Sequence, residues 1–390
     1  MDFALPPDDD ARRGSVRSWL AEHPQPSARA LAEAGYVAPH WPEPWGMGAD
    51  PETQLIVDDE LRRAGVRRPT NTIGIGWAGP TLLRAGSEEQ KERYLLPLLA
   101  ADEIWCQLFS EPGAGSDLAS LTTRAERDGD EWVVNGQKVW TSYAHVAKFG
   151  ILLARTDPEA PMHQGISYFI CPMDAPGITI RPLVDMTGTH TFNEVFFDDV
   201  RIPAANLVGR EGDGWRLAKV TLGNERVSLS GAGSLWGMGP TAEDLVEHVK
   251  RSGGSSDPRF RQRLAEVWSE GEILRLLRLR MVSAAVSGAD PGPEASVRKA
   301  LADEHGQHVM GLACDLTGAS GMLTGVGADA IYSFGLMFAP ALTIGGGTSE
   351  VQRNIIAERT LGLPHDPAPP KPASPQTEPA RSAAMGPASS

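Results

Sequence analysis

The spacing of apolar residues changes twice along this 390-residue chain, and that order constrains the fold more than any other feature. Residues 1–104 show helical periodicity, and residues 105–212 show short apolar runs separated by Gly and Pro, as in strands. Residues 213–363 return to helical periodicity over longer stretches. We therefore expect an α+β protein with an N-terminal α-helical domain, a central β-barrel or sandwich domain and a C-terminal helical domain.

Local signals place several of these elements. Ser87 and Gln90 have the spacing of a capping box, which predicts a helix start, and Asp257-Pro258 predicts another by an N-cap followed by proline. A further helix is expected to begin near Glu294. The apolar runs predict strands at 149–153, 166–171, 178–180 and 194–197.

The last segment, residues 364–390, differs in composition from the rest. It contains eight prolines among 27 residues, with many Ala and Ser. Such a segment cannot bury enough apolar surface to offset the entropy lost on ordering. We expect a disordered tail.

Charge and cysteine content exclude several classes of protein. A formal charge of −14 disfavours binding to nucleic acid or to an anionic membrane. The cysteines (Cys106, Cys171 and Cys314) have no paired spacing, which predicts a reducing compartment and no metal site. No apolar run approaches the ~20 residues of a membrane-spanning helix, and the N-terminus resembles no targeting signal. We expect a cytoplasmic protein without membrane insertion.

A glycine-rich segment opens the central part of the chain. Residues 105–117 read Trp-Cys-Gln-Leu-Phe-Ser-Glu-Pro-Gly-Ala-Gly-Ser-Asp. Three small residues, Gly113, Ala114 and Gly115, let the backbone approach a ligand closely, and their N–H groups suit a ring edge or a phosphate. Taken alone, the segment also fits an ordinary turn.

Two other segments have comparable features. Asn135-Gly136 lies between apolar runs and predicts a two-residue hairpin turn within Asn-Gly-Gln-Lys-Val-Trp-Thr-Ser, residues 135–142. Near the other end, Gly345-Gly346-Gly347 precedes Ser349 and Gln352, whose capping-box spacing predicts a helix start. The free N–H groups of that helix end would suit a phosphate or carbonyl oxygen.

These three segments, together with residues 193–203, resemble the signatures of the acyl-CoA dehydrogenase family, in the same order. The resemblance covers residues 10 to 363 and implies the family fold, in which the C-terminal domain is a four-helix bundle. It also implies FAD as the cofactor and an acyl-CoA thioester as the substrate, with electrons passing to an electron-transfer flavoprotein. The implied state is a homodimer or homotetramer, because family members share cofactor sites between subunits.

The resemblance assigns a set of residues to the cofactor and substrate. Trp140 would cover the flavin ring, and Ser142 would bond its N5 edge. Ser116, Arg226 and Gly347 would contact the substrate. The full set implied at FAD is Gln107, Phe109, Ser110, Gly115, Ser116, Trp140, Thr141, Ser142, Arg251, Gly318, Gly321, Gly347, Thr348 and Glu350.

The chain departs from the commoner family pattern at its catalytic base. Most members carry a Glu immediately before the Gly-Thr of the C-terminal motif, and this chain has Gly346 there. Isovaleryl- and long-chain-type members instead take the base from the helix after the β-domain, directly before an Arg. Glu225-Arg226 matches that position, although the pair alone also fits an exposed ion pair on a helix. We therefore expect Glu225 to be the base, and the backbone N–H of Gly346 to polarise the thioester carbonyl.

Two further expectations follow from that departure. The missing side chain at Gly346 should free volume beside the acyl group, which favours bulky, branched or long chains. Two alternative functions stay open. One is an FAD-binding or structural subunit of a mixed acyl-CoA dehydrogenase tetramer with a paralogue, and the other is a flavin oxidase or monooxygenase on the same fold.

Overall fold

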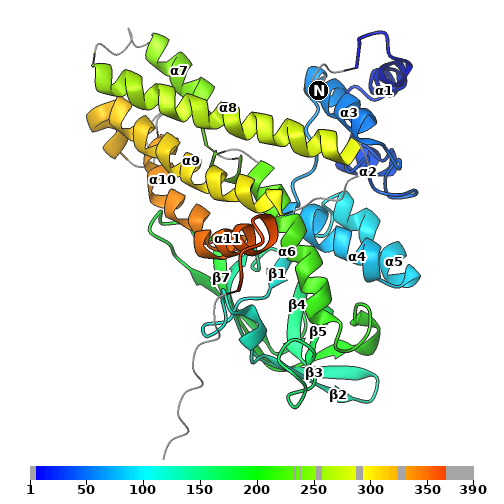
Figure 1. The fold of residues 1–390 in the computed structure, drawn as a ribbon. Coiled ribbons are helices and arrows are strands. Elements are labelled where there is room, and N and C mark those ends of the chain that lie inside the picture. The colour runs from blue at the N-terminus through cyan, green and yellow to red at the C-terminus, as the bar shows by residue number, and fades with distance from the viewer. Residues whose placement is uncertain are drawn as a thin grey trace, which may run out of the picture.

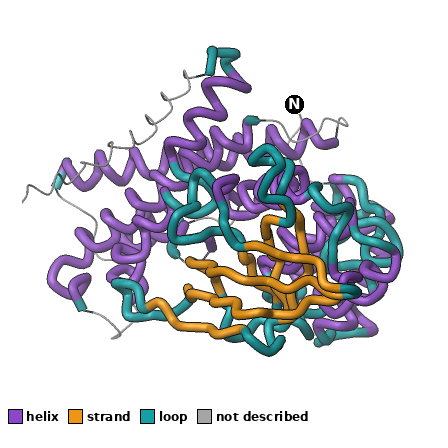
Figure 2. Tube along the Cα trace, turned by 90° about the horizontal axis from the view of Figure 1, so that it is seen from below, coloured by secondary structure: helices purple, strands orange, loops and turns teal. Residues whose placement is uncertain are grey.

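The structure is a computed structural model that describes residues 6–231, 234–237, 239–251, 257–286, 293–323 and 330–365. Helices form the N-terminal and C-terminal parts, and the strands lie between them in sequence (Figure 1). Seen from below, the strands gather on one side, with helices behind them and beside them (Figure 2). The predicted α+β fold with helical ends and a central sheet is confirmed.

In its described residues, the N-terminal part consists of helices joined by loops, without a strand. It contains α1 (Ala11–Glu22), α2 (Ala28–Glu33), α3 (Pro51–Arg63), the π-helix η1 (Gly74–Ala78), α4 (Gly79–Ala85) and α5 (Glu88–Leu99). The predicted capping box at α5 is present, because the Ser87 hydroxyl accepts from the Gln90 N–H and the Gln90 amide oxygen accepts from the Ser87 N–H. The apolar stripe of α5 is buried against the same core as η1 and α4.

The central part is one sheet of seven strands in the described residues. They are β1 (Trp105–Leu108), β2 (Arg124–Asp128), β3 (Glu131–Ser142), β4 (Phe149–Arg155), β5 (Ile166–Pro172), β6 (Ile178–Leu183) and β7 (Phe192–Pro203). β2, β3, β7 and β6 pair as antiparallel neighbours, while β4 pairs in parallel with β1 and antiparallel with β5. All four strands predicted from the apolar runs are observed, each somewhat longer than expected.

β4 is buried on both faces, which explains its unbroken apolar sequence. Phe149, Ile151 and Leu153 pack into the core that the N-terminal helices share. Leu152 and Ala154 point to the other face, into the core between the strands. The sheet therefore packs directly against the helical part through β4, together with residues of β1 and β5.

The C-terminal part is helical again and holds the longest helices. Its elements are α6 (Gly214–Gly231), η4 (Ser234–Gly237), α7 (Ala242–Arg251), α8 (Pro258–Val286), α9 (Glu294–Thr317), η5 (Gly318–Met322), α10 (Ala330–Phe338), η6 (Ala339–Thr343), α11 (Ser349–Ile355) and η7 (Ile356–Thr360). The predicted starts at Pro258 and Glu294 are confirmed. Elements thus change type between Leu99 and Trp105 and between Pro203 and Gly214, which fits the domain limits that we propose at residues 104 and 212.

Two local predictions were wrong. Asn135-Gly136 is not a hairpin turn, because β3 runs through it and pairs with β7 across a register shift at this point. A Cβ on Gly136 would lie 2.5 Å from the Thr123 hydroxyl oxygen, so close approach of two backbones, not a turn, requires the glycine. The N-cap of α11 is Thr348 and not Ser349, since the Thr348 hydroxyl accepts from the Val351 N–H at 3.3 Å.

Two predictions, on the C-terminal tail and on membrane-spanning helices, can be compared only with the described residues. The tail predicted to be disordered, at 364–390, lies outside the described residues from 366 onward. No helix in the described part of the chain is long and apolar enough to cross a bilayer.

Three hydroxyl groups join the three parts of the chain. The Thr221 hydroxyl on α6 lies 2.8 Å from the Thr81 hydroxyl on α4 and 3.1 Å from the Tyr168 hydroxyl on β5. All three residues are fully buried. Because buried hydroxyls need partners, this cluster fixes the position of α6 against the sheet and the N-terminal helices.

A buried ion pair holds the glycine-rich segment to the sheet. The Lys138 ammonium donates to the Glu111 carboxylate at 2.9 Å and to the Phe109 carbonyl at 2.9 Å. Burial alone would raise the pKa of Glu111, but the Lys138 charge and the donors of Thr122 and Thr123 lower it to about 2. Burial lowers the pKa of Lys138 to about 8. The Lys138 side chain of β3 therefore holds residues 109–111 against the sheet.

We expect Lys138→Met to lower the free energy of unfolding by roughly 3–5 kcal/mol, because it leaves Glu111 buried without a cation. Lys148→Met is the control, since Lys148 pairs with Asp174 at the exposed surface and should matter by at most ~1 kcal/mol. Urea unfolding of the three proteins measures both effects. Equal losses for the two variants would contradict the prediction.

Candidate functional site

Glu225 lies on α6, one helical turn after Thr221, and is 7% exposed. The Gln107 side-chain amide on β1 donates to its carboxylate at 3.4 Å. Burial raises the pKa of Glu225 to about 7, although Gln107, the charges of Lys299 and Arg226 and the Gly346 N–H all act to lower it. A buried carboxyl that titrates near neutral pH is suited to accept a proton.

Gly346 lies directly beside this carboxyl. A Cβ on Gly346 would be 3.6 Å from a Glu225 carboxylate oxygen. The backbone there is left-handed, with φ of 69°, and Gly347 follows with φ of 91°. The Gln352 side-chain amide donates to the carbonyls of both glycines at 3.1 Å, which holds this turn at the start of α11. The structure therefore brings together Glu225 and Gly346, which are 121 residues apart in the sequence.

The expected free volume beside Gly346 is not present. A Cβ at this position would meet the Leu229 side chain at 2.9 Å and Cε of Lys299 at 3.0 Å. These two side chains occupy the space that a Glu at position 346 would need, and the left-handed backbone adds strain for any residue but glycine. The prediction of extra acyl volume at this position was wrong.

Arg226, the residue predicted on the substrate side, is partly buried on α6. Burial lowers its pKa, while the Glu225 charge acts to raise it. Arg359 on η7 adds a like charge nearby and also lowers that pKa. The alternative of an exposed Glu-Arg ion pair is therefore not what the fold contains, since Glu225 is enclosed.

The glycine-rich segment presents an open backbone. Phe109 is buried, and Gly115 and Ser116 are exposed. No atom lies within 4 Å of a Cβ built on Gly113 or Gly115, so their neighbours in this chain do not require glycine. Close approach of a ligand to this backbone is consistent with that space.

The segment at the end of β3 combines strain with an unpaired polar atom. Trp140 has a left-handed backbone with φ of 60° and a side chain 61% exposed, edge-on to Phe192 at 5.9 Å between ring centres. The Thr141 hydroxyl is buried and has no hydrogen-bond partner in this chain. Ser142, the third residue of the predicted flavin contact, is half-buried beside them. Exposed aromatic surface next to an unsatisfied buried hydroxyl fits a bound planar ligand.

Other predicted cofactor residues lie far from Glu225 in this chain. Arg251 is exposed at the end of α7, and Gly318 ends α9 with φ of 56°. In Figure 1, α7 and this end of α9 lie at the upper left, away from α6 and α11. Gly321 is buried in η5. Asp315, near this end of α9, pairs with Arg263 at 2.6 Å.

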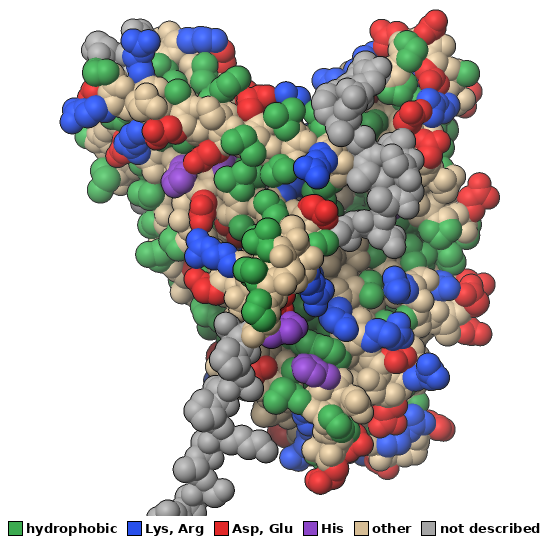
Figure 3. Space-filling model, in the orientation of Figure 1, with side chains coloured by type: hydrophobic (Ala, Val, Ile, Leu, Met, Phe, Trp, Pro, Cys, Tyr) green, Lys and Arg blue, Asp and Glu red, His purple; other side chains and the backbone are tan. Residues whose placement is uncertain are grey.

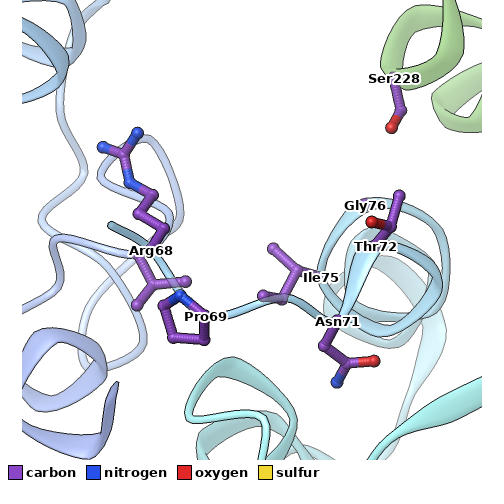
Figure 4. A pocket seen from close by; sticks show the side chains of 8 residues that line it. Arg68, Pro69, Asn71, Thr72, Ile75, Gly76 and Ser228 are labelled. Carbon is purple, nitrogen blue, oxygen red and sulfur yellow. The ribbon is translucent and has the colours of Figure 1, made fainter. Parts of the chain in front are cut away.

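A hollow opens between the N-terminal part and α6, and its lining includes a residue of α6 near Glu225 in the sequence. It has a volume of about 190 Å³ and is lined by Val37, Arg68, Pro69, Asn71, Thr72, Ile75, Gly76 and Ser228. Figure 4 shows Ser228 reaching from α6 toward Gly76 and Thr72, with Arg68 on the opposite side. Ser228 follows Glu225 by three residues, and so lies on the same side of α6.

The sequence analysis missed the residues that surround the Glu225–Gly346 contact. Leu229 and Lys299 approach Gly346, and Gln352 holds its carbonyl. Lys299 is on α9, and its four-residue spacing from Asp303 is common on any helix. Only the tertiary contact with Gly346 distinguishes it, so sequence alone offered no signal.

Comparison with known proteins agrees with the fold. Models of the N-terminal, middle and C-terminal domains of acyl-CoA dehydrogenases match residues 12–102, 106–200 and 212–361. The chain is 45% identical to the acyl-CoA dehydrogenase FadE34 of Mycobacterium tuberculosis over 335 residues, covering 86% of this chain and 46% of that protein. It is 43% identical to the acyl-CoA dehydrogenase IpdE1 of the same organism, covering 86% of this chain and 87% of that protein.

Solved structures give the same answer. A structure described as the Tcur3481-Tcur3483 steroid ACAD matches with a TM-score of 0.79 and 32% identity, covering 94% of this chain and all of that one. The ChsE4-ChsE5 complex from Mycobacterium tuberculosis matches with a TM-score of 0.76 and 32% identity, again covering 94% and 100%. The match of all three domain models, in order along nearly the whole described length, shows that this chain belongs to the acyl-CoA dehydrogenase family of oxidoreductases, whose members bind FAD.

Proposed function

We propose that this protein catalyses the FAD-dependent α,β-dehydrogenation of an acyl-CoA thioester, with Glu225 as the base that removes the Cα proton. The observation that carries the proposal is the enclosed Glu225 carboxyl beside Gly346. In most family members a Glu stands at the position of Gly346, and here the carboxylate next to that position is the one of Glu225 on α6.

The environment of Glu225 suits proton removal from a weak carbon acid. A carboxylate in water is a poor base because its pKa is about 4.3. Burial raises the pKa of Glu225 to about 7, so the deprotonated form is both available at neutral pH and more basic. Gln107 restrains one carboxylate oxygen. The Gly346 N–H next to it would also reach a thioester carbonyl placed against Gly346 and stabilise charge on that oxygen.

Residues of this chain fit the cofactor on the opposite side of the substrate. When bound, FAD supplies the hydride acceptor, which no amino acid side chain provides. We propose that the exposed face of Trp140 covers the flavin and that the Thr141 and Ser142 hydroxyls bond it. We further assign to FAD the open backbone at Gly115 and Ser116 and the preceding Gln107, Phe109 and Ser110, together with Gly347, Thr348 and Glu350 at the start of α11.

The remaining cofactor residues require a second subunit. Arg251, Gly318 and Gly321 lie away from Trp140 and Glu225 in this chain, so we assign them to the FAD of a neighbouring subunit. The C-terminal helices offer apolar surface for such a contact, since Trp268, Ile273 and Leu276 on α8 are 46–48% exposed. Figure 3 shows hydrophobic side chains exposed among charged ones over these helices. Because these residues would serve a neighbouring subunit, we propose that the protein is a homodimer or homotetramer.

We propose a bulky acyl group as the substrate, with an electron-transfer flavoprotein as the acceptor. The structure of the Tcur3481-Tcur3483 steroid ACAD, matched at 32% identity, supports the size of the acyl group. Because the space at Gly346 is filled, we propose that the added volume lies elsewhere, and the hollow lined by Gly76 and by Ser228 of α6 is a candidate for it. Arg226 would bind the substrate beside the base.

A second candidate is a subunit of a mixed acyl-CoA dehydrogenase complex. One matched structure is the ChsE4-ChsE5 complex, which favours an assembly of two different chains. The buried Glu225 favours a catalytic role for this chain within any such assembly. Expression of the chain alone separates the candidates, because a stable yellow protein that bleaches with acyl-CoA needs no paralogue.

Glu225→Gln should keep FAD bound and lose catalytic activity, because the amide has nearly the same shape but cannot accept the proton. We expect kcat to fall by ~10²–10⁴-fold, the usual contribution of a general base. Flavin bleaching by a panel of acyl-CoA thioesters measures it, with exposed Glu266→Gln on α8 as the control. A rate within about threefold of wild type would rule out Glu225 as the base.

The pH profile of kcat/KM should have an acidic limb near pH 7, because only the deprotonated Glu225 can act as the base. As pH falls through the pKa of about 7, the working fraction decreases. Rates of flavin reduction between pH 5 and 9, with stability checked at each pH, provide the test. A limb near the ordinary carboxyl pKa of ~4.3 would show that the site does not enclose the base as described.

Thr141→Val should weaken FAD binding by about the net value of one hydrogen bond, ~0.5–1.5 kcal/mol, without destabilising the apoprotein. The reason is that the buried Thr141 hydroxyl has no partner within the chain. Thr156→Val is the matched control, because the Thr156 hydroxyl already pairs with Ser167 at 2.8 Å. The Thr156→Val variant should lose apoprotein stability and keep its FAD affinity. Thermal unfolding measures the stability, and titration with FAD measures the affinity. The reverse pattern would contradict the assignment.

A further inference from the structure

A second buried charged pair lies beside the proposed base. The Lys299 ammonium donates to the Asp303 carboxylate at 2.5 Å and to the Leu342 carbonyl at 3.3 Å. Lys299 is fully buried and Asp303 is 4% exposed. Both residues are on α9, one turn apart, and neither belongs to the glycine-rich or flavin-contacting segments described above.

The lysine side chain passes the point where the usual catalytic side chain of the family would begin. A Cβ built on Gly346 would lie 3.0 Å from Cε of Lys299 on one side and 3.6 Å from the Glu225 carboxylate oxygen on the other. The cation and the carboxylate therefore flank the same glycine. Leu229, which follows Glu225 by one turn of α6, completes the enclosure at 2.9 Å.

We propose that Lys299, held by Asp303 and the Leu342 carbonyl, is a positioning residue that sets the charge state and orientation of Glu225 across Gly346. This role rests on the proposed function of Glu225 as the base. The lysine provides the opposite charge that keeps an enclosed carboxylate ionised. The aspartate neutralises most of that charge, so that the carboxylate is not stabilised too strongly to accept a proton.

The charged groups around Glu225 are consistent with this balance. Arg226 on its own helix and Lys299 on α9 both act to lower the pKa of Glu225, while burial raises it further than they lower it. Asp303 stands behind Lys299, and burial raises its own pKa to about 6 despite the lysine. β1 contributes the neutral Gln107, and Arg359 on η7 acts on Arg226. Lys299 is therefore a cation of α9 that acts directly on the proposed base.

Stability alone is a weak reason for such a pair. Moving two charges out of water usually offsets their mutual attraction, so a pair of apolar side chains would often be as stable. A buried pair is better explained where its charge acts on a third group. Here the third group is Glu225, whose carboxylate and the Lys299 side chain both approach the position of the missing Cβ of Gly346.

Two substitutions should move the acidic limb of kcat/KM in opposite directions. Lys299→Met removes the cation and should move the acidic limb to a pH about one unit higher or more. This is the size of effect that an opposite charge has on a pKa at close range. Asp303→Asn removes the carboxylate that neutralises Lys299, so the lysine charge should act more strongly on Glu225 and move the acidic limb to a lower pH. A merely structural pair predicts no such opposition. Lys91→Met is the control, because Lys91 pairs with Glu88 at the surface, and its limb should not move.

A spectroscopic readout follows Glu225 without turnover. Infrared difference spectra of the holoenzyme against Glu225→Gln isolate the protonated carboxyl band of Glu225, whose titration should shift in the same two directions. If a single variant fails to fold, Lys299→Met combined with Asp303→Asn leaves no unpaired charge and should still raise the limb, since the lysine is the nearer group.

The outcomes separate this inference from the proposed function. Loss of activity in Glu225→Gln, together with an unmoved limb and an unmoved carboxyl titration in Lys299→Met and in the double variant, would overturn the role of Lys299 alone. Full activity in Glu225→Gln would overturn the base assignment and this inference with it. Shifts of the limb and of the band in the stated directions support both.

Discussion

The enclosure of one carboxylate is the constraint on which the rest of the site depends. A charged carboxylate is costly to bury unless donors or cations replace the water it loses. For Glu225 these come from Gln107 on β1, the N–H of Gly346 before α11, and Lys299 on α9. The donors lie in three segments far apart in the chain. The proposed base therefore acquires its properties only when sheet and C-terminal helices have assembled.

The position of α6 links the enclosure of Glu225 to the packing of the other parts of the chain. Thr221, one turn before Glu225, is bonded to Thr81 of the N-terminal helices and to Tyr168 of the sheet. The opposite end of the same helix places Leu229 against Gly346. One helix thus contacts every part of the molecule within two turns of the carboxyl. A shift of any part would change the distance between Glu225 and its partners, so the proposed base is held by a helix that is fixed on several sides.

Features determined by neighbouring residues could be predicted from the sequence, and features determined by distant ones could not. The capping box at Ser87 and the helix start at Pro258 depend on local hydrogen bonds and on a fixed backbone angle, and both were predicted correctly. Asn135-Gly136 has a strong local turn signal, but the approach of Thr123 to Gly136 and the pairing with β7 keep this segment in a strand. Thr348 rather than Ser349 caps α11, because Gln352 turns back to the glycine carbonyls.

The same distinction applies to the site. The resemblance to a family identified Glu225 and Gly346 as a matched pair of departures, and the fold places them in contact. It suggested that the glycine leaves space, whereas Lys299 and Leu229 fill that space. A helical lysine four residues before an aspartate has no distinctive pattern, so its approach to Gly346 could be found only in three dimensions.

Glycine at position 346 is therefore more than the loss of a base. Its left-handed backbone, with φ of 69°, lets the turn before α11 direct its N–H at Glu225 while Gln352 holds its carbonyl. A side chain there would be strained by the backbone and would collide with the lysine on one side and the leucine on the other. In the site that we propose, the carboxyl on α6 and the cation on α9 both approach the same point beside Gly346, where the glycine has no Cβ. A Glu restored at position 346 would therefore have to displace the ends of the Lys299 and Leu229 side chains.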